Sequence, residues 1–576
     1  MSKLFTIFLV ISYVTLHSQN LLSGKWKFKT GDDMQWKNNT YADAQWSEIY
    51  AGIVFEKQGF ENYDGIAWYR QSITIPSSFK SDAQKMGGLI LKLAKIDDAD
   101  ETYFNGELIG KTGSFPPNFL NAYDQYREYT IPADKVKWDA PNLVAVRVYD
   151  GSGNGGIYGD PLSLSVKGFD DSFDISAVFP VTNHVFLSAK DVKCNIQLKN
   201  TFYIDFKGSA NITVRNDFGK ITYEKSIPAT VKKNSTTNMP VSIPDMQPGF
   251  YQLIIDYQSP LAHKTHISTF ACEPEKVLSP TDAQPDFADY WNRAKKELAA
   301  VAPQYNIIIV DSLSKGNKNM YVVEMRSLGN VLVRAWYSVP KKQGKYPALL
   351  HVQGYSSYLK LTDKYHYQSD DMIVMGLNIR GHGFSKDNIN PGFPGYLQHQ
   401  INDKEMYIYR GAYMDCRRAL DFLFSRNEVD TTRVGVEGGS QGGALSIATA
   451  ALNPERIKVC VPGVPFLSDF KDYFVVGNWP AYEFKKLVET DKASTWDKVY
   501  HTLSYIDIKN LAPWVKCPVL MGVGLKDDIC PPHINFAMYN NLSVPKQYVI
   551  YPHAGHGLPD EYTNVKFEFI RQKLMK

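Results

Sequence analysis

Several kinds of sequence feature are scarce in this chain of 576 residues. The six cysteines are spread thinly, and they form neither a CxxC pair nor a Cys/His cluster with zinc spacing. This excludes a disulfide-rich scaffold, and we expect no metal site and no cofactor. Blocks of like charge are absent and the formal net charge is only +3, so no nucleic-acid partner is expected.

Long apolar runs are equally scarce, and the one that stands out lies at the N-terminus. Lys3 precedes the apolar stretch Leu4–Val14, and Leu16-His17-Ser18 offers a cleavage site. This is the pattern of a signal peptide over residues 1–18, whereas a membrane anchor would need about 20 apolar residues. No cysteine follows the run, which argues against a lipoprotein. We therefore predict a secreted or periplasmic protein without membrane insertion.

Length and composition favour several ordinary globular domains. With 44% apolar residues, the chain is too long for one core, and roughly two to four domains are expected. Alternating runs such as Trp68–Ile75 and Asn142–Val148 predict an antiparallel β domain over residues 21–168. The strands Gly208–Arg215 and Gly249–Asp256 predict a small immunoglobulin-like β-sandwich over residues 169–272.

Two of the cysteines, Cys194 and Cys272, fall within this second β region. In an oxidising compartment they can pair as a disulfide, and the alternative is a pair of buried free thiols. The sequence alone does not decide between the two states.

The pattern changes after a polar, proline-containing linker at residues 273–280. A helix is predicted at Asp286–Ala300, and short apolar strands then alternate with helices at 411–425 and 442–452. The predicted strands are Tyr346–Val352, Asp371–Leu377, Arg433–Val436 and Pro518–Val523. Such alternation predicts a mostly parallel sheet buried on both faces, over residues 280–576.

A candidate nucleophile lies at one of these strand-to-helix turns. Gly438-Gly439-Ser440-Gln441-Gly442 matches G-x-S-x-G, directly after an apolar strand and before an alanine-rich helix. The sharp turn pushes the serine hydroxyl outward, and small residues at both ends avoid clashes. This context favours Ser440 as a nucleophile over an inert serine in a glycine-rich turn.

Serine needs a base, and the base needs an acid that orients it. In chain order the acid comes next, and Asp527 is the first carboxylate after the strand 518–523, with Asp528 as its competitor. His556 follows the next strand and lies between two glycines, with His553 as the alternative on the same loop. We predict the triad Ser440, Asp527 and His556.

Backbone amides and a lid complete the predicted site. The amide of Gln441 should form half of an oxyanion hole, and the amide of Tyr355, after the strand 346–352, the other half. The stretch from Pro465 to Tyr482 follows the next strand, and we expect Pro465, Trp479 and Tyr482 to line a substrate pocket. Ordinary packing of these side chains is an equal alternative.

Residues 280–576 resemble carbohydrate esterase family 7, the acetyl xylan esterase/cephalosporin-C deacetylase group of α/β-hydrolases. The stretches that carry this resemblance are Tyr409–Leu423, Gly438–Gly442, Cys517–Pro532 and Tyr551–His556. The resemblance places the same triad and the same oxyanion amides on the residues named above. It also implies an acetylated carbohydrate as substrate, and it leaves room for a homo-oligomer such as the hexamer typical of the family.

Two positions depart from the family pattern. The family has Arg-Gly-Gln where this chain has Arg380-Gly381-His382, and glutamate where Gly557 follows the predicted histidine. Neither change removes a predicted catalytic atom, but both are positioned to reshape the pocket or the contacts between subunits.

The N-terminal region resembles the galactose-binding-like jelly roll of glycoside hydrolase family 2 and of sialate O-acetylesterases, through Asp64–Arg70, Ile96–Gly110 and Asn142–Asp150. Its acidic run at residues 97–101 lacks the residue order of an EF-hand, so a polar turn is expected rather than a Ca²⁺ site. Gly151–Gly156 matches G-x-G-x-x-G but opens no predicted helix, so nucleotide binding is not expected.

These patterns together predict a secreted serine esterase that removes O-acetyl groups from poly- or oligosaccharides through an acyl-enzyme. The alternatives are a serine peptidase with the same triad and a non-catalytic glycan-binding protein. The sequence does not identify the glycan.

Overall fold

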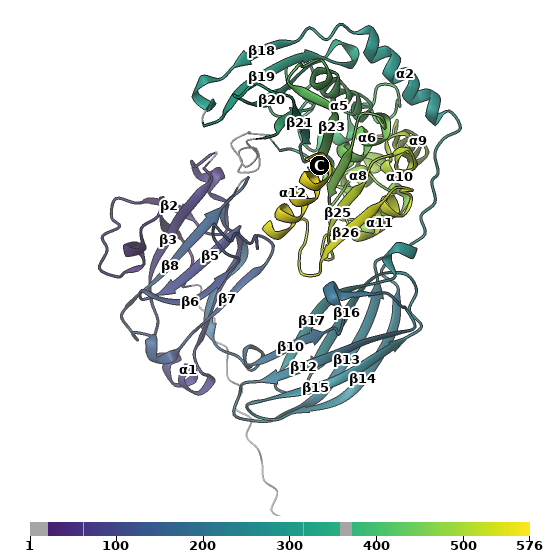
Figure 1. The fold of residues 1–576 in the computed structure, drawn as a ribbon. Coiled ribbons are helices and arrows are strands. Elements are labelled where there is room, and N and C mark those ends of the chain that lie inside the picture. The colour runs from purple at the N-terminus through teal and green to yellow at the C-terminus, as the bar shows by residue number, and fades with distance from the viewer. Residues whose placement is uncertain (1–20, 62, 152, 315, 358–370, 576) are drawn as a thin grey trace, which may run out of the picture.

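The computed structural model describes residues 21–61, 63–151, 153–314, 316–357 and 371–575 (Figure 1). The predicted signal peptide at residues 1–18 lies outside these ranges. Within them, no helix combines the length and the apolar character that are needed to cross a bilayer.

The N-terminal part consists of two antiparallel sheets packed around one apolar core (Figure 1). One sheet has the strand order β2-β1-β3-β8-β5-β6 and the other has the order β7-β4-β9. Its elements are β1 (Lys25–Thr30), β2 (Ser47–Tyr50), β3 (Gly65–Thr74), α1 (Lys80–Met86), β4 (Leu89–Asp97), β5 (Ala99–Phe104), β6 (Glu107–Thr112), β7 (Tyr126–Ile131), β8 (Pro141–Asp150) and β9 (Gly156–Val166).

Two sequence features of this part can be located. The acidic run lies where β4 leads into β5, and there the buried Asp100 forms an ion pair with the buried Arg127 at 2.9 Å. The glycine-rich stretch after β8 leads directly into β9 of the other sheet, so it opens no helix.

The middle part is a second pair of sheets with its own core. A three-stranded sheet has the order β10-β12-β15, and a five-stranded sheet has the order β11-β17-β16-β13-β14. The strands are β10 (Phe173–Val178), β11 (Val185–Phe186), β12 (Asp191–Asn200), β13 (Phe206–Asn216), β14 (Ile221–Val231), β15 (Ser235–Pro244), β16 (Gly249–Gln258) and β17 (His263–Cys272). The boundaries of the two β domains remain predictions.

Cys194 and Cys272 are buried free thiols, as are the other four cysteines. Burial raises the pKa of Cys194 to about 11 and that of Cys272 to about 12, so both thiols are neutral at physiological pH. Of the two predicted alternatives, the structure has the unpaired state.

The C-terminal part is built on one nine-stranded sheet of order β18-β19-β20-β22-β21-β23-β24-β25-β26. From β22 to β26 neighbouring strands are parallel, and β18, β19 and β20 join antiparallel at one edge. The strands are β18 (Asn306–Ile309), β19 (Lys318–Arg326), β20 (Leu332–Pro340), β21 (Tyr346–Val352), β22 (Ile373–Asn378), β23 (Val429–Gly439), β24 (Val459–Gly463), β25 (Val519–Gly524) and β26 (Lys546–Tyr551).

Helices cover both faces of this sheet, which explains why its central strands are apolar throughout (Figure 1). A small core lies beneath α12 on one face, and the main core lies between the other face and the remaining helices. The helices are α2 (Phe287–Ala300), α4 (Gly395–Gln398), α5 (Ile408–Phe424), α6 (Gln441–Leu452), α7 (Phe470–Val476), α8 (Ala481–Thr490), α9 (Trp496–Ile506), α10 (Ile508–Leu511), α11 (Pro532–Asn540) and α12 (Asp560–Leu574). The predicted mostly parallel sheet is confirmed.

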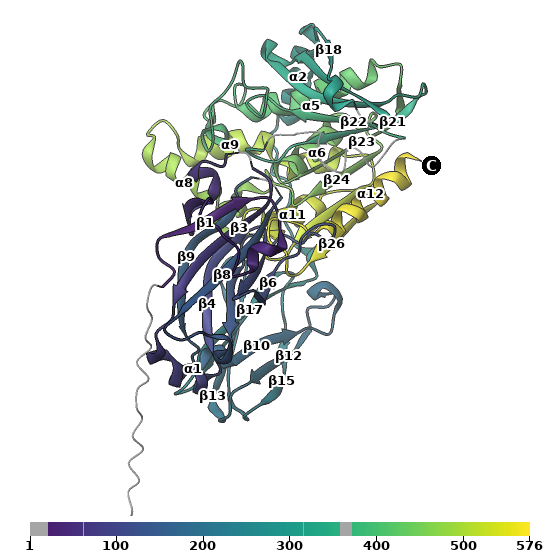
Figure 2. The same cartoon turned by 90° about the vertical axis from the view of Figure 1, so that its left-hand side faces the viewer.

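The middle part packs against the end of the C-terminal sheet where β25 and β26 finish, and the N-terminal part lies beside both (Figures 1 and 2). The Thr269 hydroxyl donates a hydrogen bond to the carbonyl of Pro552 at 3.1 Å. The ring of Phe250 lies 5.5 Å from that of Phe536 in α11. The loops after the C-terminal strands therefore face the two β-rich parts.

Candidate active site

Ser440 lies at a strained turn between a strand and a helix. β23 ends at Gly439, α6 begins at Gln441, and Ser440 between them has φ 57° and ψ −121°. A positive φ is costly for a residue with a β-carbon, and it persists only where the surroundings hold it. Here the Ser440 N–H donates to Gly463 at 2.9 Å, and the Phe466 N–H donates to the Ser440 carbonyl at 3.1 Å.

The glycines on either side of Ser440 let β21 approach the turn closely. A β-carbon placed on Gly438 would lie 2.5 Å from the carbonyl oxygen of Val352, and one on Gly442 would lie 2.3 Å from it. Both distances are shorter than a van der Waals contact, so only glycine fits at either position. The close approach brings the loop after β21, which includes Tyr355, next to the N-terminus of α6.

The two predicted oxyanion donors come from these adjacent segments. Gln441 is the first residue of α6, so its backbone N–H is one of those that have no partner within the helix. Its side chain is fixed as well, because the Tyr409 hydroxyl donates to its Oε1 at 2.7 Å and its Nε2 lies 3.3 Å from His382 Nε2.

His382, one of the two departures from the family pattern, is part of this support. Its imidazole is buried against the rings of Tyr396 and Phe393, with centroid distances of 4.4 and 5.0 Å. Burial lowers its pKa to about 4, so His382 is neutral at physiological pH. An uncharged imidazole therefore lies in hydrogen-bond range of the Gln441 side chain.

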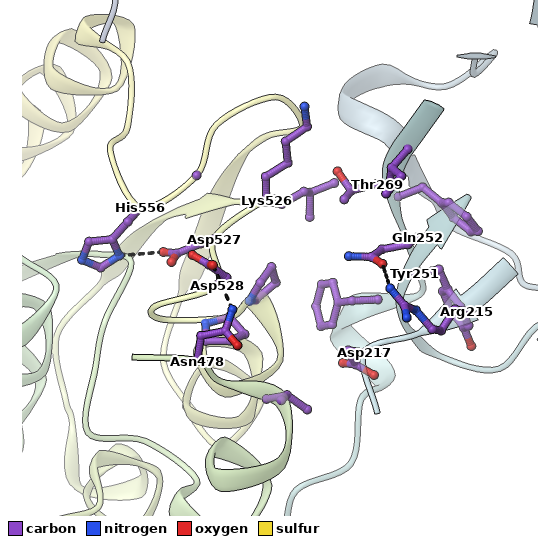
Figure 3. A pocket seen from close by; sticks show the side chains of 18 of the residues that line it. Arg215, Asp217, Tyr251, Gln252, Thr269, Asn478, Lys526, Asp527, Asp528 and His556 are labelled. Carbon is purple, nitrogen blue, oxygen red and sulfur yellow. Dashed lines mark hydrogen bonds and ion pairs between the residues drawn. The ribbon is translucent and has the colours of Figure 1, made fainter. Parts of the chain in front are cut away.

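Asp527 and His556 form an ion pair on the loops that follow β25 and β26 (Figure 3). His556 Nδ1 lies 2.9 Å from Asp527 Oδ2, and Asp527 Oδ1 accepts from the N–H groups of Ile529 and Cys530 at 2.9 and 2.8 Å. The Asp527 side chain is fully buried and that of His556 is 21% exposed. Burial would lower the pKa of His556, but the Asp527 carboxylate outweighs it and holds that pKa well above 6.5.

The two competing residues point elsewhere. Asp528 accepts a hydrogen bond from the side chain of Asn478 at 3.0 Å. The ring of His553 lies 5.1 Å from that of His184 in the middle part, and burial lowers its pKa. The structure thus brings Asp527 and His556 together, and Asp528 and His553 have other partners.

A cysteine that the sequence did not single out lies beside the predicted nucleophile. Cys530 Sγ is 4.0 Å from Ser440 Oγ, and the thiol also contacts the imidazole of His556. Burial raises the pKa of this thiol, so it is uncharged at physiological pH. Cys530 lies three residues after Asp527 in the same loop, but a single buried cysteine carries no sequence signal for such a position.

The residues predicted to bind substrate have different surroundings. The Trp479 ring lies 5.7 Å from that of Tyr355, which brings it next to a predicted oxyanion donor. Tyr482, in the first turn of α8, is 52% exposed. Pro465 is buried, and its carbonyl accepts from Asn535 at 2.9 Å. Trp479 thus lies against a predicted oxyanion donor, and Pro465 directly precedes Phe466, whose N–H donates to the Ser440 carbonyl.

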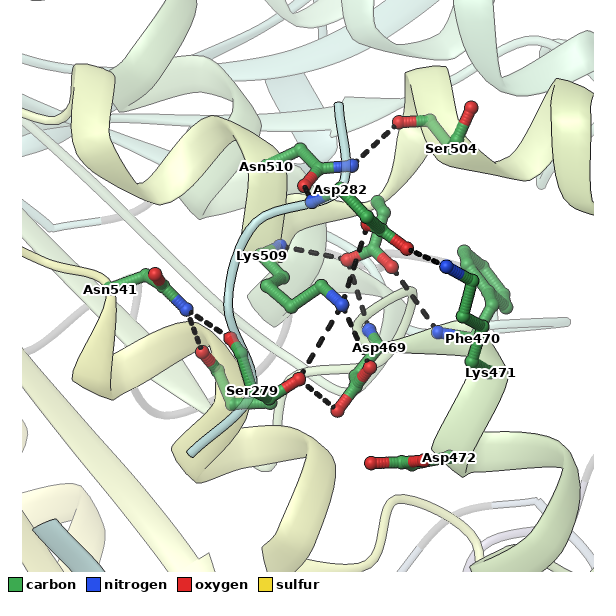
Figure 4. A network of polar contacts seen from close by, with 12 residues as sticks. Ser279, Asp282, Asp469, Phe470, Lys471, Asp472, Ser504, Lys509, Asn510 and Asn541 are labelled. Atoms are coloured by element: carbon green, nitrogen blue, oxygen red, sulfur yellow. Dashed lines mark hydrogen bonds and ion pairs between the residues drawn. The ribbon is translucent and has the colours of Figure 1, made fainter. Parts of the chain in front are cut away.

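One group of side chains has the composition of a metal site, formed by Asp469, Asp472 and His533. Protein cations already neutralise it. The Lys509 ammonium lies 2.9 Å from Asp469 (Figure 4). His533 itself is paired with Asp472 at 3.1 Å. Ser279 also donates to Asp469 at 2.6 Å, so this network holds the linker against the C-terminal part.

Comparison with known proteins identifies the family. The family model described as acetyl xylan esterase (AXE1) matches residues 275–573, which is more than half of the chain. The protein belongs to the acetyl xylan esterase (AXE1) family. The match covers the nine-stranded sheet, the strained turn at Ser440, and the Asp527–His556 pair.

Individual relatives agree with this assignment. The acetyl esterase Axe7A of Xylanibacter ruminicola is 26% identical over 366 residues, which cover 60% of this chain and 81% of that protein. An acetyl xylan esterase from Paenibacillus sp. R4, of known structure, is 31% identical with a TM-score of 0.50, and the match covers 52% of this chain and 99% of that one. The protein is thus a carboxylic ester hydrolase with a C-terminal α/β-hydrolase fold.

A further curated relative matches a shorter stretch of the chain. The acylamino-acid-releasing enzyme of Rattus norvegicus is 27% identical over 199 residues, which cover 32% of this chain and 25% of that enzyme.

Proposed function

We propose that this AXE1-family protein is a secreted or periplasmic serine esterase that removes O-acetyl groups from acetylated poly- or oligosaccharides. The substrate class is supported by the family and by the acetyl esterase and acetyl xylan esterase to which the chain is similar. Secretion is supported by the apolar N-terminal run after Lys3. In this proposal the N-terminal part is a galactose-binding-like jelly roll and the middle part an immunoglobulin-like sandwich, as their paired sheets suggest.

The reaction would proceed through an acetyl-enzyme. His556 would accept the Ser440 proton through Nε2 while the hydroxyl attacks the acetyl carbonyl, and the Asp527 carboxylate would stabilise the resulting imidazolium. The amides of Tyr355 and Gln441 would hold the oxyanion. The His556 imidazolium would then give its proton to the departing sugar oxygen, which leaves as a hydroxyl group, and a water activated by the same base would release acetate.

One observation carries this proposal: a serine in a strained backbone conformation and the Asp527–His556 pair both contact the same side chain, Cys530. Ser440 has φ 57°, His556 Nδ1 is 2.9 Å from Asp527, and Cys530 contacts both Ser440 and His556. The Ser440 hydroxyl has to turn from the Cys530 thiol to the imidazole, because Cys530 is its hydrogen-bond partner among the described residues. Catalytic hydrogen bonds often tighten only when substrate binds.

The test is acetate release from acetylated xylan and from 4-nitrophenyl acetate by wild type and by Ser440→Ala. We expect the variant to lose about a million-fold in kcat, because the triad acts as a unit. Ser446→Ala is the matched control in the same helix, since its hydroxyl donates to the carbonyl of Gly442 at 2.8 Å. Ester hydrolysis by Ser440→Ala at the wild-type rate would overturn the proposal.

An N-acetylated peptide panel separates this function from that of a serine peptidase with the same triad. Faster release of an acetyl-amino acid than of acetate would contradict an esterase role. A protein that binds acetylated xylan without releasing acetate would be a non-catalytic glycan-binding protein.

A further inference from the structure

A cleft of about 700 Å³ lies where the three parts of the molecule meet, next to the Asp527–His556 pair (Figure 3). Asp527 and His556 themselves are among the residues that line it. An acetyl group would fill only a small part of this volume, which lies in the range of pockets for ligands of several rings, about 300–1,000 Å³. Ser440, Tyr355 and Gln441 are not among its lining residues, so the cleft adjoins the proposed site of the ester and has room for the part of a substrate beyond the acetyl group.

The floor of the cleft is the outer face of the five-stranded sheet in the middle part. Arg215 of β13 and Gln252 of β16 are paired in register, and the Arg215 guanidinium donates to Gln252 Oε1 at 2.6 Å (Figure 3). Thr269 of β17 lies on the same floor and binds the carbonyl of Pro552, which belongs to the histidine loop. The sheet is thus held directly against the loop that carries His556.

The N-terminal part supplies a wall through the loop before β7. Tyr123 and Asp124 line the cleft, and a β-carbon placed on Gly555 would lie 3.3 Å from Asp124 Oδ2. Burial raises the pKa of Tyr123, and the charges of Asp124 and Asp527 raise it further. The Tyr123 hydroxyl therefore stays protonated beside the loop that carries Asp527. The Tyr158 hydroxyl donates to the Tyr123 carbonyl at 2.6 Å and supports this loop.

The chemistry of the lining suits an uncharged, hydroxyl-rich ligand. Positive and negative side chains are balanced in number around the cleft, so neither an anionic nor a cationic ligand is favoured. The positive side chains are Lys95, Arg215 and Lys526, and the negative ones are Asp124, Asp217 and Asp528. Tyr123 adds a ring with an apolar face and a polar hydroxyl, which matches a sugar ring with its apolar face and its rim of hydroxyl groups.

We infer that this cleft is the binding site for the saccharide chain of the substrate, with specificity determined by residues of both β-rich parts. The inference rests on the proposed esterase function and deepens it, since it assigns Tyr123, Asp124, Arg215 and Gln252 to recognition of the sugar. The Asp527–His556 pair belongs to the AXE1 domain, and the two β-rich parts that precede it select the saccharide that reaches this pair.

The test uses the full-length protein and two substrates, partially acetylated xylotetraose and 4-nitrophenyl acetate. For Arg215→Ala and Tyr123→Ala, we expect the ratio of kcat/KM for the saccharide to kcat/KM for the small ester to fall at least ten-fold. The loss should lie mainly in KM, because the removed groups bind the substrate away from the reacting bond. Lys207→Ala, an exposed position on the same strand as Arg215 that is not part of the cleft, should keep the wild-type ratio.

Binding is measured separately with the Ser440→Ala protein and deacetylated xylotetraose, by isothermal titration. We expect binding that Arg215→Ala weakens at least ten-fold and Lys207→Ala leaves intact. An unchanged substrate ratio in both cleft variants would overturn the inference while leaving the esterase function in place. Loss of the proposed function would instead be seen as wild-type protein that hydrolyses neither ester.

Discussion

At the scale of single residues, His556 is the group whose charge controls the proposed chemistry. Asp527 holds the pKa of His556 above the ordinary value of about 6.5. The imidazole therefore stays protonated to a higher pH than that of a free histidine. Only the neutral imidazole can accept the Ser440 proton. Activity should therefore rise as pH increases through a pKa that lies above 6.5.

The substitution Asp527→Asn tests this dependence. It removes the charge that raises the His556 pKa, so the acidic limb of the kcat/KM profile should move to lower pH. The rate should fall by up to about ten-thousand-fold, because the amide no longer fixes the tautomer of the imidazole. The measurement is kcat/KM for 4-nitrophenyl acetate between about pH 5 and about pH 9. This range extends to both sides of the ordinary histidine pKa of about 6.5.

Asp528→Asn is the matched control for that profile. Asp528 is the neighbouring carboxylate, but its partner is Asn478 rather than His556. The limb should keep its wild-type position in this variant. A shift of the limb in Asp528→Asn and none in Asp527→Asn would reverse the assignment of the acid.

At the scale of elements, the close approach of β21 to the strand-to-helix turn determines where the predicted oxyanion donors lie. Gly438 and Gly439 are neighbours in β23, but they differ in the space around them. A β-carbon on Gly438 would lie 2.5 Å from the Val352 carbonyl oxygen, and one on Gly439 would have no atom within 4 Å. The two glycines form a natural pair for comparison.

We expect Gly438→Ala to destabilise the protein by about 1–3 kcal/mol, the usual cost of forcing an extra carbon into a packed site. Gly439→Ala should change stability by less than about 0.5 kcal/mol, as for substitutions away from such contacts. Thermal unfolding of the two variants under identical conditions measures the difference. Equal unfolding temperatures would show that β21 does not approach Gly438 as closely as described.

At the scale of the whole molecule, a buried histidine connects the middle part to the C-terminal part. His533 of α11 binds Asp217 of the turn between β13 and β14 at 2.8 Å and Asp472 of α7 at 3.1 Å, with Asp469 at 3.8 Å. Burial alone would lower its pKa, but the carboxylates outweigh burial and raise it to about 9. His533 is thus protonated at physiological pH.

The pKa of His533 is raised in the folded state. The ion pairs of His533 therefore contribute their full stability below about pH 6.5, and this contribution is lost as pH rises through about 9. Its size is on the order of 3 kcal/mol, at about 1.4 kcal/mol for each pKa unit. The unfolding temperature of wild type should fall between pH 7 and pH 10, and that of His533→Gln should start lower and change less across this window.

Asp217→Asn separates the contact between the two parts from the contact within the C-terminal part. It removes the partner of His533 in the middle part and retains Asp472. The variant should lie between wild type and His533→Gln in its dependence on pH. Identical pH curves for wild type and His533→Gln would show that the pair does not hold the two parts together.

The sequence by itself determined most of the C-terminal fold and the candidate residues. The predicted strand at Tyr346–Val352 is β21 without any shift, and the predicted helix at Asp286–Ala300 is α2 with Asp286 as its N-cap. Such features are local, because apolar runs and glycine spacing act over a few residues. The sequence also narrowed the acid to two aspartates and the base to two histidines.

Only the tertiary structure decided which of these candidates meet. The pairing of Asp527 with His556, the position of Cys530 beside Ser440, and the cleft that Tyr123 and Arg215 help to form all join residues far apart in the chain or on different loops. The physical reason is that periodicity predicts which face of an element is buried but not which distant element covers it. The side chains that line the cleft beside the Asp527–His556 pair therefore become known only when the three parts are packed together.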